Sequence, residues 1–95
     1  MSSESRKSEP GLPFSKCFHA LAEPTRIQIL ELLKANECCV QDIVRTLGIN
    51  QSHISFHLRT LKEAGLVTAQ RRGRHVYYAL NVDQFGILEE YLSAY

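Results

Sequence analysis

The sequence predicts one small α+β domain that is mainly helical, with the core element order ααα-ββ-α and one further short helix before this core. Apolar residues recur at helical spacing in several segments, and a short turn at Gly48 separates two of them. Two runs typical of β-strands then flank a basic loop at residues 71–75. A chain of 95 residues has room for one core and one domain of this kind.

The first predicted helix follows a polar tail. Residues 1–12 are rich in Ser, Glu, Lys and Pro, so we expect a disordered segment there and the folded domain over residues 13–95. The apolar residues that begin this domain are Phe14, Cys17, Phe18 and Leu21. Their spacing of i, i+3, i+4 and i+7 places all four on one face of a helix.

Two more helices are predicted before the turn. Pro24 suits the first turn of a helix, and the strongly apolar run 25–34 predicts that this helix is mostly buried. The same helical spacing returns in Val40, Ile43, Val44 and Leu47. Gly48 then ends the third helix, because glycine readily adopts the left-handed conformation of a C-terminal cap.

The next predicted helix covers residues 51–64 and has one polar face. Asn50 is a favourable N-cap, and Gly65 ends the helix. The inward side is formed by Ile54, Leu58 and Leu61. The outward side carries Gln51, Ser52, Ser55, Phe56, Arg59 and Thr60.

Two strands and a last helix complete the domain. The runs 67–70 and 76–80 favour strands, and the loop between them contains one glycine and three arginines, which predicts a hairpin with a basic tip. The segment 83–95 carries a further apolar stripe of Phe85, Leu88, Leu92 and Tyr95. We therefore expect a short terminal helix there.

Two short helices joined at residues 48–50 and followed by a basic hairpin make a winged helix-turn-helix. The charge distribution agrees with such a fold. The chain has a net charge of only +1, but residues 45–75 hold six basic and one acidic side chains, and residues 76–95 hold three acidic side chains and no basic one. This segregation predicts one face aimed at a polyanion.

We predict that this polyanion is double-stranded DNA. The helix 51–64 would enter the major groove, where Gln and Arg recognise bases and an exposed Phe contacts a thymine methyl group. The arginines of the hairpin tip would contact phosphates or the minor groove, which makes the affinity depend steeply on salt. The predicted DNA-binding residues are Gln51, Ser52, His53, Ser55, Phe56, Arg59, Arg71, Arg72 and Arg74.

His57 differs from these residues, because it lies next to the inward-facing Leu58. A hydrogen-bonding scaffold role or a phosphate contact is favoured over metal binding. His53 and His57 have the i, i+4 spacing of metal ligands, but a metal there would occupy the DNA-facing side and no third ligand is evident.

Three stretches carry a family resemblance. Residues 20–33 read ALAEPTRIQILELL, residues 38–67 read CCVQDIVRTLGINQSHISFHLRTLKEAGLV, and residues 71–80 read RRGRHVYYAL. Together they resemble the ArsR/SmtB family of transcriptional repressors, and the match covers most of the chain. The resemblance implies a homodimer that binds an inverted-repeat operator and leaves it when an effector, often a metal or metalloid ion, binds.

The resemblance also suggests a thiol site for that effector. Cys39 aligns with the first Cys of the family's pattern Glu-Leu-Cys-Val-Cys-Asp-Leu, Gln41 replaces the second Cys, and Asp42 is kept. The vicinal pair Cys38 and Cys39 could bind a thiophilic ion such as arsenite, with Cys17 as a third ligand from the same or the partner chain. A position at a helix N-terminus favours the thiolate of Cys39, which Asp42 partly opposes.

Structural roles for the same cysteines stay open. Cys17 could simply pack in its apolar stripe, and Cys38 and Cys39 could serve capping and packing alone. The family's other metal site, on the terminal helix, is not expected, because the segment 83–95 contains Asp83, Glu89 and Glu90 but no His.

The two apolar stripes at the ends of the domain are too much for one small core to cover. We therefore predict a homodimer, which would also place two recognition helices about 34 Å apart. The predicted interface residues are Phe14, Phe18, Phe85, Leu88, Leu92 and Tyr95.

Other classes of protein are excluded or kept as alternatives. The sequence contains no catalytic motif, so we expect no enzyme, and DNA binding requires no cofactor. The absence of an apolar run of about 18 residues excludes a membrane partner, and three sparse cysteines indicate a cytoplasmic protein. The alternatives are a repressor that senses thiol oxidation or no ligand, and a winged-helix module that binds a protein.

Overall fold

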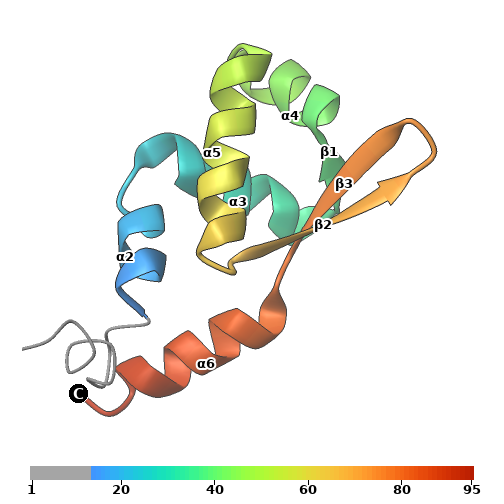
Figure 1. The fold of residues 1–95 in the computed structure, drawn as a ribbon. Coiled ribbons are helices and arrows are strands. Elements are labelled where there is room, and N and C mark those ends of the chain that lie inside the picture. The colour runs from blue at the N-terminus through green and yellow to red at the C-terminus, as the bar shows by residue number, and fades with distance from the viewer. Residues whose placement is uncertain (1–13) are drawn as a thin grey trace, which may run out of the picture.

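The computed structural model describes residues 14–95, so the predicted tail at 1–12 lies outside the described residues. The helices are α2 (Ser15–Leu21), α3 (Pro24–Ala35), α4 (Val40–Leu47), α5 (Gln51–Glu63) and α6 (Val82–Leu92). The strands are β1 (Cys38–Cys39), β2 (Val67–Arg72) and β3 (His75–Leu80), as Figure 1 shows.

The winged helix-turn-helix prediction is confirmed. Helices α3, α4 and α5 pack on one another, and the antiparallel sheet has the strand order β1-β3-β2. The β2–β3 hairpin extends away from the helices as the wing, while α6 lies at the other end of the domain near α2 (Figure 1). None of the described helices is long and apolar enough to cross a membrane.

Local signals in the sequence explain where the helices of the motif begin and end. Pro24 occupies the first turn of α3. Gly48 adopts a φ of 69° at the end of α4, a conformation that glycine allows at little cost. The side chain of Asn50 then accepts a hydrogen bond from the backbone N–H of His53 at 3.0 Å, which caps α5 as predicted.

The inward face of α5 forms the centre of the core. Ile54, Leu58 and Leu61 are fully buried, and they pack with apolar residues of the other helices. The remaining fully buried large side chains include Ile29 of α3, Ile43 of α4, and Leu66 between α5 and β2. The sequence pattern therefore predicted correctly which side of α5 faces the protein and which faces solvent.

Strand β1 is an element that the sequence analysis did not predict. It contains only Cys38 and Cys39, which pair with Tyr78 and Tyr77 of β3. Two residues are too few to show the period-two alternation by which a strand is recognised. The pairing attaches the start of α4 directly to the wing.

The stripe of the terminal helix is divided between the chain's own core and its surface. Leu88 is only 5% exposed within a single chain, and Phe85 packs against the same core. Leu92 is 48% exposed, and Tyr95, which lies beyond the end of α6, is 90% exposed. Leu88, which we predicted at a dimer interface, lies in the core of its own domain in the single chain.

Candidate nucleic-acid interface

The outward face of α5 is polar, with one apolar exception. Phe56 is 55% exposed, although burying a phenylalanine side chain is worth about 2 kcal/mol. Gln51, Ser52, His53 and Arg59 are also exposed, and Ser55 is half-buried. The structure thus brings all six predicted contact residues of α5 to one accessible helix surface.

The orientation of α5 depends on a buried arginine, Arg26 of α3, which is 6% exposed. Its Nε donates to the carbonyl oxygen of Ala20 at 2.8 Å, and its Nη2 donates to that of His19 at 3.4 Å. Its Nη1 lies 3.1 Å from Nδ1 of His57 on α5. One guanidinium therefore ties the end of α2 and the middle of α5 to α3.

Glu23 completes this network as the N-cap of α3. Its carboxylate accepts the backbone N–H of Arg26 at 3.0 Å, and that hydrogen bond is the main cause of its lowered pKa. The Glu23 oxygen is 3.9 Å from Nδ1 of His57, which is too far for a hydrogen bond. The segment from Glu23 to Arg26 thus has a structural role, because it supplies both the cap of α3 and the buried cation.

The hairpin tip is basic, but its three arginines are not equivalent. Gly73 adopts a φ of 63° at the turn, as a two-residue hairpin loop requires. Arg72 forms an ion pair with Glu37, and its Cζ lies 4.5 Å from the centre of the Tyr77 ring. Within the described residues neither Arg71 nor Arg74 has an ion pair, and both are exposed.

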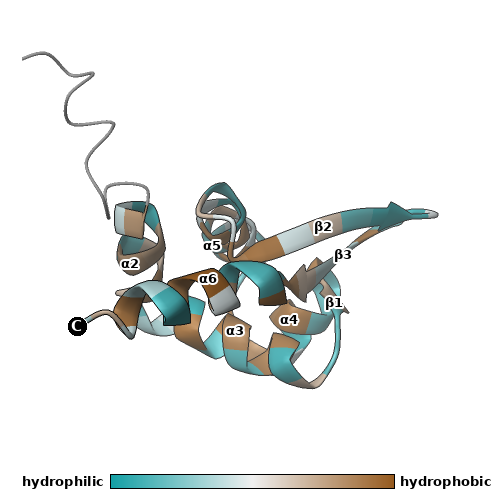
Figure 2. Cartoon of the chain, turned by 90° about the horizontal axis from the view of Figure 1, so that it is seen from below, coloured by the Kyte–Doolittle hydropathy of each residue, from teal (hydrophilic) through white to brown (hydrophobic). Residues whose placement is uncertain are grey.

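Ion pairs reduce the positive charge that the segment 45–75 carries in the sequence. Glu37 pairs with Arg72, and the hydrogen bond that Arg72 donates to the Glu37 carboxylate is the main cause of the raised pKa of Arg72. Asp42 pairs with Arg45 at 2.7 Å. Both acidic partners precede residue 45, so the charge counted for the segment 45–75 does not include them. Figure 2 still shows the far end of the hairpin as strongly hydrophilic.

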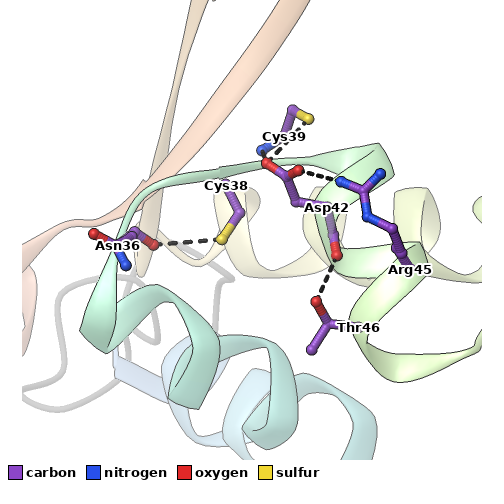
Figure 3. Close-up of polar contacts among 6 residues, drawn as sticks. All are labelled: Asn36, Cys38, Cys39, Asp42, Arg45 and Thr46. Carbon is purple, nitrogen blue, oxygen red and sulfur yellow. Dashed lines mark hydrogen bonds and ion pairs between the residues drawn. The ribbon is translucent and has the colours of Figure 1, made fainter.

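The two neighbouring cysteines lie at the start of α4 (Figure 3). Cys39 is the N-cap, as predicted, and both its backbone N–H and its thiol donate to Oδ2 of Asp42, at 3.2 and 3.3 Å. The hydrogen bond from the Cys39 backbone is the main cause of the lowered pKa of Asp42. The thiol of Cys38 donates to the carbonyl oxygen of Asn36 at 3.4 Å.

The geometry of β1 separates the two sulfur atoms. Successive residues of a strand point to opposite faces, and Figure 3 shows the sulfur atoms of Cys38 and Cys39 on opposite sides of the ribbon. Burial raises the pKa of the Cys38 thiol, and the charge of Asp42 raises it further. These features favour capping and packing for the pair.

Cys17 does not join these thiols within the chain. It is fully buried, its thiol donates to the carbonyl oxygen of Ala64, and its sulfur accepts from Nε2 of Gln84, both at 3.3 Å. Residues 14–95 contain no group of three His, Cys, Asp or Glu side chains arranged to hold a metal ion. The structure therefore does not bring Cys17 together with Cys38 and Cys39 as the predicted third ligand, because its side chain joins α2 to α5 and α6.

Aromatic residues join α2 to α6. The rings of Phe14 and Tyr91 stack with centroids 4.3 Å apart, and Phe18 contacts the same tyrosine. Ile87 is 51% exposed and lines an open cavity of about 290 Å³ beside Phe14 and Tyr91. Sequence spacing missed Ile87 because it lies outside the stripe formed by Phe85, Leu88 and Leu92.

Comparison with known proteins agrees with this architecture. Residues 23–69 match the family described as bacterial regulatory protein, arsR family. The chain is 41% identical over 64 residues to the transcriptional repressor SdpR of Bacillus subtilis, covering 67% of this chain and 71% of SdpR. It is 36% identical over 88 residues to the arsenical resistance operon repressor of the same organism, covering 90% of this chain and 84% of that repressor.

A solved structure shows the same fold. The homodimeric winged helix-turn-helix DNA-binding domain of a possible ArsR-family regulator from Mycobacterium bovis superposes with a TM-score of 0.72 at 33% identity, covering 86% of this chain and 79% of that one. Its family consists of DNA-binding regulators and not of enzymes. With its winged helix-turn-helix and these relatives, the chain belongs to the ArsR/SmtB-type family of transcriptional repressors.

Proposed function

We propose that this protein represses transcription by binding an inverted-repeat operator in double-stranded DNA as a homodimer. The observation that carries this proposal is the exposed surface of α5, where Phe56 stands among polar side chains that are able to read base edges. If α5 had no binding partner, the exposure of the apolar Phe56 side chain to water would have no compensating contact.

The proposed DNA contacts follow from the position of each residue. Gln51, Ser52, His53, Ser55, Phe56 and Arg59 would face the major groove from α5. Arg71 and Arg74 would contact phosphates or the minor groove from the wing. Arg72 would contribute to the same surface only after leaving Glu37, so its contribution should be the smallest of the three.

The homodimer would use the apolar surface where α2 and α6 meet. Phe14, Phe18, Ile87 and Tyr91 contribute to this surface, with Leu92 and Tyr95 at its end. The homodimeric relative from Mycobacterium bovis supports such an assembly. Pairing through this end would leave both α5 surfaces and both wings available to DNA.

The proposed effector is a thiophilic ion bound through Cys38 and Cys39. The support is the similarity to an arsenical resistance operon repressor and the position of Cys39 at the start of α4. Since adjacent strand residues point apart, both sulfurs could reach one ion only if β1 separated from β3. The alternatives are thiol oxidation at these cysteines and a repressor without a ligand.

Loss of one wing arginine should reduce the salt dependence of DNA binding. Arg74→Ala should weaken binding to all duplexes and lower the slope of log affinity against log salt by about one, because one phosphate contact is lost. Lys34→Ala on α3 removes the same charge outside the proposed interface and should leave the slope unchanged. Fluorescence anisotropy with a duplex selected from a random pool measures both. Equal slopes for the two variants would contradict the role of the wing.

Two matched substitutions should separate dimer formation from DNA binding. Ile87→Glu places a charge on the α2–α6 surface and should give monomers at micromolar concentration in sedimentation equilibrium, where the unchanged protein is a dimer. Phe56→Glu changes the other exposed surface and should leave the dimer intact while DNA binding falls. A monomeric unchanged protein would overturn the proposed assembly.

Release of DNA by a thiophilic ion should depend on the β1 cysteines and not on Cys17. Arsenite, cadmium, zinc and mercury are titrated into the DNA complex while thiolate absorption and DNA release are followed. Cys39→Ser and Cys38→Ser should each abolish release, and Cys17→Ser should retain it because Cys17 is bonded inside the domain. Release that survives all three substitutions would eliminate a thiol sensor.

A further inference from the structure

We propose that Arg26 positions His57 so that the Nε2–H group of this histidine donates a hydrogen bond to a DNA phosphate. The inference rests on the proposed function, because it assumes that α5 lies in the major groove. It assigns a role to the one histidine of α5 whose ring contacts the buried side of the domain.

Arg26 is held in place without any help from His57. Its guanidinium donates to the backbone carbonyl groups of Ala20 and His19, and its own backbone N–H is bound by Glu23. The side chain is also almost completely buried. Its remaining nitrogen, Nη1, therefore has a fixed position 3.1 Å from Nδ1 of His57.

This contact determines which ring nitrogen of His57 carries the proton. Arginine has only donors and keeps its charge in proteins, so Nδ1 must act as the acceptor. In a neutral imidazole the proton is then on Nε2. Glu23 does not compete for Nδ1, because its nearest oxygen is 3.9 Å away.

The Nε2–H group is available to a partner outside the chain. The only hydrogen bond that His57 makes within residues 14–95 is the one at Nδ1. No buried side-chain nitrogen or oxygen in this part of the chain lacks a partner. Since Nε2 has no partner, it must reach solvent, although the side chain of His57 as a whole is only 15% exposed.

The position of His57 on α5 favours a phosphate over a base. Successive helix residues are about 100° apart, which places His57 on the flank between the exposed Phe56 and the buried Leu58. The rings of His57 and Phe56 meet edge to face with centroids 5.3 Å apart. When Phe56 faces the groove, a donor on the flank of the helix is directed toward the DNA backbone.

Two substitutions separate the two nitrogens of the ring. His57→Asn keeps an acceptor near Nδ1 and lacks a donor near Nε2. It should preserve the thermal unfolding midpoint and weaken DNA binding about tenfold, the effect of one lost hydrogen bond to a charged group. His57→Gln keeps a donor near Nε2 and loses the acceptor. It should bind DNA within about threefold of the unchanged protein and unfold at lower temperature.

The sequence and salt dependence test the phosphate assignment. The loss in His57→Asn should be equal for a selected duplex and a random duplex, and the salt slope should not change, because a neutral donor releases no counterions. A loss confined to the selected duplex would show a base contact and overturn the assignment. Equal DNA affinities for the Asn and Gln variants would overturn the proposal itself.

Nitrogen NMR of the protein without DNA gives a second, independent test. Long-range ¹⁵N–¹H correlations of His57 should show the Nε2–H tautomer, and Arg26→Lys should relax this preference. The Nδ1–H tautomer in the unchanged protein would refute positioning by Arg26. If the unchanged protein bound no duplex at all, the proposed function would fail along with the phosphate contact, and the tautomer measurement would still decide the role of Arg26.

Discussion

The arrangement of this domain depends on the burial of one positive charge. A guanidinium that is removed from water has to find a partner for most of its donors, because an unpaired buried charge is strongly destabilising. Arg26 meets this requirement with two backbone carbonyl groups at the end of α2 and with His57 of α5. The helix that we place in DNA is therefore held by the same contact that joins the first helices of the domain.

A second consequence concerns the distribution of charge. The net charge of +1 is close to zero because a basic central segment is offset by acidic residues on both sides of it. In the folded chain, Glu37 and Asp42 pair with Arg72 and Arg45, so part of the basic segment is neutralised by residues that precede it. The positive charge that remains for DNA lies mainly at the tip of the wing and on the outer face of α5.

Local chemistry explains which features could be predicted from the sequence. The caps at Asn50 and Gly48 and the apolar stripe of α5 act within one or two helical turns, and the structure confirms all three. Strand β1, the Arg72–Glu37 pair and the bonds of Cys17 join residues far apart in the sequence. No periodicity reports such contacts, so the separation of the two sulfurs and the burial of Leu88 became visible only in the folded chain.

The central claim is that α5 and the wing form the DNA-binding surface. An NMR titration of the ¹⁵N-labelled protein with a selected duplex tests this claim most directly. The account predicts that the largest amide shifts cluster on α5 from Gln51 to Arg59 and at the hairpin tip around Gly73, with only small shifts along α6. Shifts concentrated on α2 and α6, with α5 unchanged, would contradict it.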